Sequence, residues 1–288
     1  MKRTILFLLL GGMILSIFSY GKMGTAAVSA AMNMPSEKTT TAKTAKITAA
    51  KTPVTTAGKT VKTTTTKTAK TAAAKTTASD SSKKAKKNFY IKKINKSVWK
   101  RIKGKSYKAD CTVPREDLRY LHVLHKDLNG KTHEGEMIVN AYIAKDVLTI
   151  FKKLYKHDYP IEKIRLVDEY GADDEKSMED NNSSSFNFRF ISHTTKVSKH
   201  GLGLAVDINT LYNPYTKTVN GKQIIEPVTA GAYLDRSKDF PYKIDHDDLC
   251  YKLFTKRGFI WGGDWSDLKD YQHFEMPDAV VSQLYPNN

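Results

Sequence analysis

The sequence SKHGLGLAVDIN, residues 198–209, places a histidine, two glycines and an aspartate inside an otherwise apolar run. Apolar side chains alternate with small or acidic ones over residues 204–208, which predicts a half-buried strand. The two glycines allow the chain to turn before this strand, so that His200 can fold back toward the face that carries Asp207. Burying a carboxylate between apolar neighbours is costly unless a cation meets it. The sequence therefore predicts an arginine or a metal ion as the partner of Asp207.

A second segment near the C-terminus carries the same kinds of side chain. In DYQHFEM, residues 270–276, apolar residues alternate around His273, and Asp270 stands three positions before it. Two imidazoles and one carboxylate, with a further carboxylate nearby, match a catalytic zinc site that has three protein ligands and one open position. The spacing alone also fits a hydrogen-bonded His–Asp pair in a protein core, and both interpretations stay open at this point.

The remainder of the folded part mixes hairpins with separate helices. Apolar and polar residues alternate on both sides of Asn129-Gly130, which is a strong hairpin signal. Residues 147–154 repeat apolar side chains at helical spacing, and this helix should end before Pro160. Residues 161–167 are typical of a strand.

Further signals follow along the chain. The acidic segment 173–185 predicts a loop or a short helix. We expect a helix that begins after an N-cap at Asp245 and ends at Gly258. Residues 259–265 predict a short buried strand that breaks at a glycine pair. Hairpins mixed with separate helices, without internal repeats, predict a single α+β domain.

The first 104 residues differ in composition from the rest. Two basic residues precede an apolar run over residues 4–20, and small residues follow it, which is the layout of a secretory signal peptide over residues 1–30. An uncleaved membrane anchor is the alternative. Residues 31–104 are rich in Thr, Lys and Ala and poor in large apolar side chains, so they predict a disordered basic linker. The folded domain is therefore expected over residues 105–288.

The formal net charge of +17 belongs to this N-terminal part. Residues 38–87 hold 13 lysines against one acid, whereas residues 106–288 hold 24 Lys and Arg against 28 Asp and Glu. A basic tail without interleaved aromatic residues, behind an export signal, argues against a nucleic-acid partner. We expect an exported monomer, extracellular or associated with a bacterial cell wall. Its linker is expected to meet anionic wall polymers or a membrane surface, with a merely solvated spacer as the alternative.

Cys111 and Cys250 are the two cysteines of the chain. In an exported protein one disulfide between them is the economical prediction, and two unpaired thiols are the alternative. Neither cysteine has the CxxC or CxxH spacing of a metal site.

Two motifs allow a comparison with a known family. SKHGLGLAVD, residues 198–207, fits the pattern Ser-x-His-x-x-Gly-x-Ala-x-Asp, and WGGDWSDLKDYQHFE, residues 261–275, fits Trp-Gly-Gly-Asp-Trp followed by Asp-x-x-His-Phe-Glu. In this order and separation they resemble the VanY-like D-alanyl-D-alanine carboxypeptidases and L-alanyl-D-glutamate endopeptidases, zinc peptidases that cut bacterial cell-wall peptides. The resemblance extends over approximately residues 110–285. It implies the D-Ala-D-Ala carboxypeptidase/hedgehog-like fold, with a central antiparallel sheet flanked by helices.

The resemblance also implies a role for individual residues. His200, Asp207 and His273 are expected to bind one zinc ion, Asp270 to act as the general base, and Arg189 to steady the developing oxyanion. The chemistry is consistent, because zinc acidifies water, a carboxylate can take the proton, and a fixed cation can meet the negative charge of the tetrahedral carbon's oxygen.

One position departs from the pattern of many relatives, which carry Glu where this chain has Asp270. If the shorter side chain cannot reach the water, Glu275 or Asp264 are the substitutes. Without that role, Glu275 is expected to brace its strand and Asp264 to serve in a turn or beside the ligands. Ser198 is expected to shape the turn before His200.

The leading hypothesis is an exported zinc peptidase that acts on peptidoglycan stem peptides, as a carboxypeptidase that removes a terminal D-Ala. An endopeptidase that cuts within the stem or a cross-link is the first alternative, since the choice depends on a cation that meets the substrate carboxylate. Lys196 and Lys199 are candidates for that cation, although solvated side chains are the simpler interpretation. A wall-binding protein on the same fold, without turnover, is the second alternative.

Overall fold

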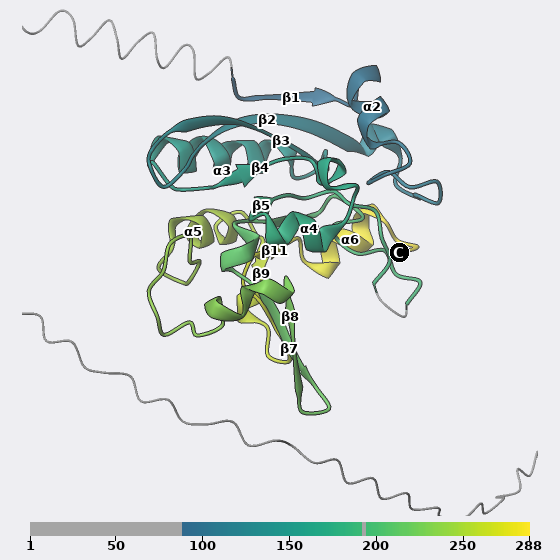
Figure 1. Ribbon diagram of the computed structural model, residues 1–288. Helices are drawn as coiled ribbons and strands as arrows, with labels where there is room; N and C mark the ends of the chain where they lie inside the picture. Colours follow the sequence, from purple (N-terminus) through teal and green to yellow (C-terminus); the bar gives the residue numbers. More distant parts are fainter. Residues whose placement is uncertain (1–87, 192–193) are drawn as a thin grey trace, which may run out of the picture. The chain divides into compact units, whose positions relative to one another are not determined.

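The computed structural model describes residues 88–191 and 194–288. The predicted signal peptide and most of the predicted linker lie outside the described residues. Within the described ranges, helices are mixed with small, mainly antiparallel sheets, as expected for an α+β fold (Figure 1). No helix in these two ranges is both long enough and apolar enough to cross a membrane.

The first sheet contains the predicted hairpin. Strands β1 (Tyr90–Lys93), β2 (Leu118–Lys126) and β3 (Thr132–Asn140) pair antiparallel in the order β1-β2-β3. Helix α3 (Ala144–Lys156) packs against this sheet through its apolar face, and it ends before Pro160 (Figure 1). The hairpin around Asn129-Gly130 and the helix that follows it are therefore confirmed.

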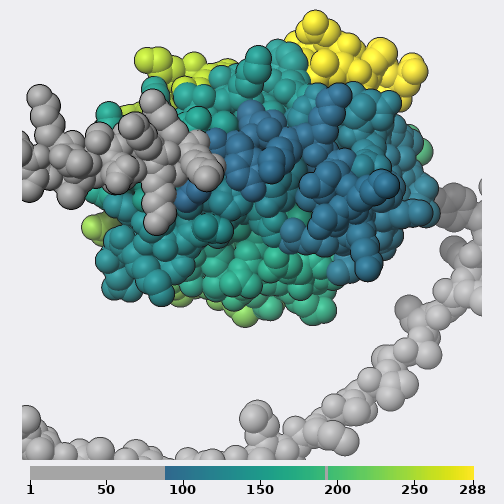
Figure 2. Space-filling view, turned by 90° about the horizontal axis from the view of Figure 1, so that it is seen from above, coloured from purple at the N-terminus to yellow at the C-terminus, as the bar shows by residue number. Residues whose placement is uncertain are grey.

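The folded part begins earlier than the expected boundary at residue 105. Strand β1 and helix α2 (Lys96–Ile102) fall in the segment that its lysine content assigns to the linker. The buried apolar side chains of this segment are Val98 and Ile102 in α2, with Phe89 and Ile94 on either side of β1. Both elements belong to the blue surface in Figure 2. Composition misleads here because the apolar residues recur at the spacing of one face while the lysines occupy the other.

The other strands form three small sheets rather than one central sheet, which corrects the expected architecture. Strands β4 (Lys163–Ile164) and β5 (Asn182–Ser183) pair parallel. The second sheet has the order β6-β11-β9, with β6 (Ala205–Asp207), β11 (His273–Glu275) and β9 (Ile260–Trp261). The third has the order β10-β7-β8, with β10 (Lys269–Asp270), β7 (Tyr215–Val219) and β8 (Lys222–Glu226). The β7–β8 hairpin projects from the rest of the domain in Figure 1.

Three further α-helices lie in the described part after α3, namely α4 (Asp174–Glu179), α5 (Leu249–Thr255) and α6 (Asp278–Leu284). The N-cap of α5 is Asp248 and not Asp245, because the Asp248 carboxylate accepts hydrogen bonds from the first free amides of the helix. The helix ends at Thr255 and not at Gly258 as expected, and a turn follows that includes Gly258, whose φ of +80° suits glycine. Short 3-10 helices in the described part span Arg115–Asp117, Val167–Tyr170, Thr210–Tyr212, Val228–Tyr233 and Gly262–Asp264.

Both cysteines are free thiols, so the predicted disulfide is wrong and the alternative of two unpaired cysteines holds. Cys250 is fully buried in α5 among core residues, whereas Cys111 lies partly buried in the loop after α2. Burial raises the pKa of both thiols.

Candidate metal centre

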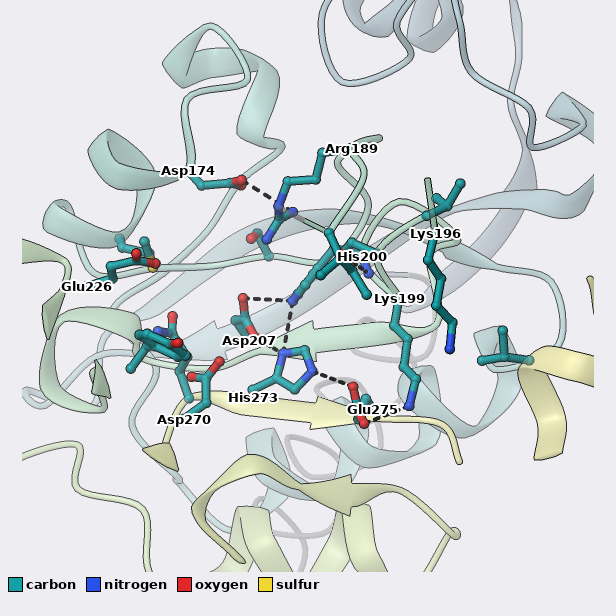
Figure 3. Close-up of a pocket in the computed structure, with 18 of the residues that line it drawn as sticks. Asp174, Arg189, Lys196, Lys199, His200, Asp207, Glu226, Asp270, His273 and Glu275 are labelled. Atoms are coloured by element: carbon teal, nitrogen blue, oxygen red, sulfur yellow. Dashed lines mark hydrogen bonds and ion pairs between the residues drawn. The ribbon is translucent and has the colours of Figure 1, made fainter. Parts of the chain in front are cut away.

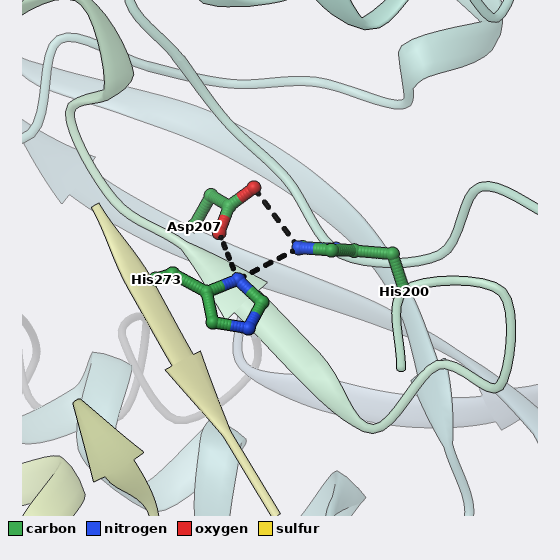
Figure 4. A group of neighbouring side chains, drawn as sticks. All are labelled: His200, Asp207 and His273. Carbon is green, nitrogen blue, oxygen red and sulfur yellow. Dashed lines mark hydrogen bonds and ion pairs between the residues drawn. The ribbon is translucent and has the colours of Figure 1, made fainter. Parts of the chain in front are cut away.

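Two neighbouring strands bring the predicted site residues together. Strands β6 and β11 pair antiparallel with Asp207 opposite His273, so both side chains leave the sheet on the same face. His200 comes from the loop before β6 and points to the same spot (Figure 4). The predicted proximity of His200 and Asp207 is thus what the structure shows, and His273 joins them from a strand 66 residues away.

The loop before β6 can return His200 to the strand because of Gly203. This glycine has a φ of +66°, and a Cβ at this position would lie 2.8 Å from the Asn140 amide nitrogen. Its carbonyl accepts a hydrogen bond from that amide at 2.7 Å, and the Leu204 amide donates to the Lys199 carbonyl at 2.8 Å. A side chain at residue 203 would both strain the backbone and push the loop from the first sheet.

Three side chains meet at short distances. Asp207 Oδ2 lies 3.1 Å from His200 Nε2, and Asp207 Oδ1 lies 3.0 Å from His273 Nδ1. The two imidazole nitrogens are themselves 3.0 Å apart. His200 and His273 are 6% and 7% exposed, so these atoms converge at a largely buried point of the domain.

The far nitrogen of each imidazole has an acceptor of its own. His200 Nδ1 donates to the Ser185 carbonyl at 2.7 Å, and His273 Nε2 donates to Glu275 Oε2 at 3.0 Å. These contacts fix the ring orientations and leave His200 Nε2 and His273 Nδ1 as the atoms that face each other. Two imidazole lone pairs and a carboxylate that converge in this way need a cation between them.

The converging atoms fit a metal ion. Each of His200, Asp207 and His273 offers one ligand atom, and these atoms lie within 4.8 Å of one another. Two nitrogens and one carboxylate oxygen form a donor set that zinc accepts. Burial by itself raises the pKa of Asp207, but the charges and hydrogen bonds of His200 and His273 hold this pKa well below its usual range. Burial alone lowers the pKa of His273, yet its bonds to Asp207 and Glu275 raise it to about 10. In the metal-free site a proton on His273 therefore supplies the positive charge.

Asp270 reaches the same cavity from strand β10. Burial raises the pKa of Asp270 to about 7. The positive charge of His273 opposes this shift, and the negative charge of Asp207 adds to it. Its Oδ1 atom is buried and accepts no hydrogen bond from the described residues. The backbone of Gly262 packs tightly here, since a Cβ on it would come within 2.6 Å of the Asp270 carbonyl oxygen. This contact explains why the first glycine of the WGGDW motif has no side chain.

Arg189 lies on another wall of the cavity and comes from the segment after β5. Its Nη1 atom is 3.3 Å from Asp174 Oδ2, and Asn187 donates to the other oxygen of Asp174 at 2.8 Å. The structure thus adds Asp174 as a partner of Arg189, which no motif indicated.

The substitutes considered for Asp270 have other partners. Glu275 accepts from His273 and also contacts Lys199 at 2.7 Å, which agrees with a bracing role. Asp264 accepts from His246 at 2.7 Å and is absent from the cavity lining. Lys199 is not solvated as expected, since its side chain is 15% exposed and also reaches Asp278.

The three candidate ligands line one cavity of about 450 Å³, together with Asp270, Arg189, Glu275 and Lys199 (Figure 3). Ser198 is also in the lining, and its hydroxyl accepts from the His200 amide at 3.2 Å, as expected for a turn. Sequence reasoning missed Glu226 and Gln272. Glu226 stands in no recognisable motif and reaches the cavity through strand pairing, whereas Gln272 occupies an unspecified position of the second motif, directly before His273. The described lining includes Asp174, Arg189, Lys196, Lys199, Tyr215, Glu226, Trp265, Asp270, Gln272 and Glu275 around the three candidate ligands.

One comparison with known proteins gave a match. A family model described as D-alanyl-D-alanine carboxypeptidase matches residues 192–276. The matched segment contains His200, Asp207, Asp270 and His273, and it confirms the resemblance that the two motifs indicate. The match supports a peptidase. No solved structure gives a significant match to the chain.

Proposed function

We propose that this protein is a zinc-dependent peptidase that hydrolyses peptidoglycan stem peptides, and that it acts as a D-alanyl-D-alanine carboxypeptidase. The observation that carries the proposal is the convergence of His200, Asp207 and His273 beside Asp270, whose buried oxygen is without a partner among the described residues. The family match over residues 192–276 supports the same class of substrate.

The zinc ion would be held by His200 Nε2, His273 Nδ1 and the carboxylate of Asp207. Zinc bound in such a site supplies Lewis-acid chemistry, which acidifies water and polarises a carbonyl oxygen. Ser185 and Glu275 keep the two imidazoles in the orientation that this requires, because the Ser185 carbonyl and the Glu275 carboxylate each accept a hydrogen bond from the far ring nitrogen.

The protein's own acid–base work would fall to Asp270 and Arg189. Asp270 takes a proton from the attacking water, whose oxygen forms a bond to the carbonyl carbon of the peptide. As the carbon–nitrogen bond breaks, the same carboxyl returns the proton to the leaving amine. The Arg189 guanidinium would oppose the negative charge that develops on the carbonyl oxygen, and Asp174 holds that guanidinium at the cavity wall.

A carboxypeptidase also needs a cation for the terminal carboxylate of its substrate. Lys199 is engaged by Glu275 and Asp278. Lys196 lines the cavity, and no carboxylate in the described part of the chain forms an ion pair with it. This available cation favours cleavage at a free C-terminus over cleavage inside a stem or a cross-link.

We also propose that the protein works outside the cytoplasm and that its basic N-terminal sequence holds it near anionic wall polymers. The separation of charge between residues 38–87 and residues 106–288 supports this proposal. Retention of the full chain on purified cell walls should fall steeply with salt, and replacing the lysines of residues 38–87 by glutamine should abolish it. Retention unchanged by that replacement would contradict the proposal.

The test of the enzymatic function uses the full chain, purified with zinc, and a peptide that ends in D-Ala-D-Ala together with isolated muropeptides. Mass spectrometry should find the loss of a single alanine from free stem ends, and chelation should abolish it. Internal fragments would instead identify an endopeptidase. Unchanged peptides with folded, zinc-loaded protein would leave a wall-binding protein as the remaining interpretation.

Two variants locate the base. Asp270→Asn should lower kcat by about 10²-fold to 10⁴-fold while zinc still binds, because the loss of a general base affects proton transfer and not the ligands. Asp264→Asn serves as the matched control, since this residue lies outside the cavity lining. A loss confined to Asp264→Asn would move the base to that residue.

A further inference from the structure

A row of three side chains crosses the β10-β7-β8 sheet. Asp270 pairs with Tyr215, and Tyr215 pairs with Glu226 on the next strand. Directly paired residues in antiparallel strands project on the same face, and all three residues line the cavity of the candidate metal centre. Because neighbouring strands lie about 4.8 Å apart, Glu226 sits about 10 Å from Asp270 along this wall. One or two peptide residues span that distance with their side chains.

Glu226 is available to a ligand. No Lys, Arg or His within residues 88–191 and 194–288 forms an ion pair with its carboxylate, and the residue is exposed toward the cavity. The nearby Asp174 already has Arg189 as its partner, and the Glu175 carboxylate accepts from the Val228 amide at 2.6 Å. Arg189 is the cation whose charge acts on Glu226, but it is ion-paired with Asp174, so the Glu226 carboxylate has no ion-pair partner of its own among the described residues.

A second acceptor in the same cavity also lacks a donor. Gln272 is 2% exposed, it lines the cavity, and its Oε1 atom accepts no hydrogen bond from the described residues. Buried acceptors of this kind are costly unless a ligand or water supplies the donor. Both Glu226 and Gln272 thus indicate a ligand that carries N–H groups.

Acidic and basic side chains lie on opposite sides of the cavity. In Figure 3, Glu226 and Asp174 lie on one side of the three candidate ligands, and Lys196 and Lys199 lie on the other. Since Asp174 and Lys199 are both ion-paired, the groups left for a substrate are the carboxylate of Glu226 and the ammonium of Lys196. A peptide that carries a positive charge on one side of the cleaved bond and a carboxylate on the other matches this arrangement.

From this geometry we propose that Glu226 is a specificity residue that binds an ammonium group on the substrate peptide, such as the free side-chain amine of a diamino acid next to the cleaved pair. The inference rests on the proposed peptidase function and adds the substrate class to it. Glu226 takes no part in proton transfer and acts only on which peptides bind productively.

The test compares two peptides that differ in one charge, Nα-acetyl-Lys-D-Ala-D-Ala and its Nα,Nε-diacetyl counterpart. The wild-type full chain, loaded with zinc, should show kcat/KM about threefold to tenfold higher for the free amine, as expected for a partly exposed ion pair. Glu226→Gln should bring the ratio of the two values close to one. Glu179→Gln removes the same charge from an exposed position of α4 outside the cavity lining, and it should keep the wild-type ratio.

Equal kcat/KM values for the two peptides in the wild type, or a ratio unchanged in Glu226→Gln, would overturn the proposal. Equilibrium binding of both peptides to the metal-free protein separates this result from a failure of the peptidase function. If neither peptide is cleaved but the free amine still binds more tightly in a Glu226-dependent way, the peptidase function fails and the role of Glu226 stands. Absence of both cleavage and binding would overturn both.

Discussion

The Nε2 atom of His273 lies 3.0 Å from Glu275 Oε2, so a carboxylate on the same strand determines which ring nitrogen faces Asp207. The strand places the two side chains on one face because they are two residues apart. Lys199 holds the other oxygen of Glu275 at 2.7 Å and keeps the carboxylate in position.

Removing this brace should weaken metal binding. Glu275→Ala is expected to raise the dissociation constant for zinc about 10-fold to 100-fold, because outer partners of ligating histidines contribute that much. Glu275→Gln keeps an acceptor oxygen, so it should raise the dissociation constant for zinc by a smaller factor. Competition with a chromophoric chelator measures both values, and Glu179→Gln provides the control for loss of charge alone. Zinc affinities equal to wild type in the Ala variant would contradict the orienting role.

Zinc binding should release a proton from His273. Although burial lowers its pKa, hydrogen bonds to Asp207 and Glu275 raise it to about 10, so the metal-free site is protonated at neutral pH. The apparent affinity should therefore rise about tenfold per pH unit between pH 7 and 9. Titration calorimetry at pH 8 in buffers of different ionisation enthalpy should detect about one proton per zinc. At that pH Asp270, with a pKa of about 7, is mostly ionised already. An affinity independent of pH would show that His273 is neutral before the metal arrives.

Local sequence patterns predicted the parts of this site that depend on one strand or one turn. Alternation around Asp207 and the glycines before it indicated that His200 returns to the strand, and the structure brings the two together. The pairing of Asp207 with His273 is a long-range contact. Their residue types fitted a zinc site or a core hydrogen-bonded pair, and the family resemblance favoured the zinc site. Glu226 could not be found, because its place on the far side of Tyr215 from Asp270 depends on the pairing of three strands.

The same difference between local patterns and long-range contacts explains the errors in the predicted fold. Lysine-rich composition hid β1 and α2, although β1 pairs with β2 and the Val98 and Ile102 side chains of α2 are buried in the core. Asp245 and Asp248 are both suitable N-caps by sequence. Tertiary packing decides for Asp248, which also accepts from the buried Tyr159 hydroxyl at 3.1 Å.

Gly262→Ala should separate catalysis from metal binding. A Cβ at this position would lie 2.6 Å from the Asp270 carbonyl oxygen and 2.8 Å from the Asp270 Cβ, so the base must move. We expect kcat to fall by about 10²-fold, the cost of misplacing a catalytic group by about 1 Å. Zinc affinity should change little, because the three atoms nearest to the added methyl group belong to Asp270 and Trp265 and not to a candidate ligand.

The matched control for this change is Gly231→Ala, where a Cβ would meet no atom within 4 Å. The ratio of kcat between the two alanine variants, at equal zinc occupancy, is the measurement. Equal rates would mean that the position of Asp270 is unimportant for turnover.

The stability of the domain should depend on pH through Asp248. Burial raises its pKa to about 6, against the hydrogen bonds from the Cys250 and Tyr251 amides and the Tyr159 hydroxyl. An unfolded aspartate titrates near 3.9, so between about pH 4 and 6 the folded state holds the proton more tightly. The free energy of unfolding contributed by this group is therefore largest below pH 4 and falls as the pH rises to 6, by at most about 3 kcal/mol.

Asp248→Asn removes the charge and keeps an effective N-cap. Its free energy of unfolding should vary less between pH 4 and 7 than that of the wild type, and at pH 7 the variant should be at least as stable. Asp248→Ala loses the cap as well and should lose about 1 kcal/mol relative to Asp248→Asn at either pH. Urea denaturation at pH 4.5 and 7.5 measures all three proteins. If Asp248→Asn retained the full pH dependence of the wild type, ionisation of Asp248 would not lower the free energy of unfolding. Another buried acid would then have to be responsible.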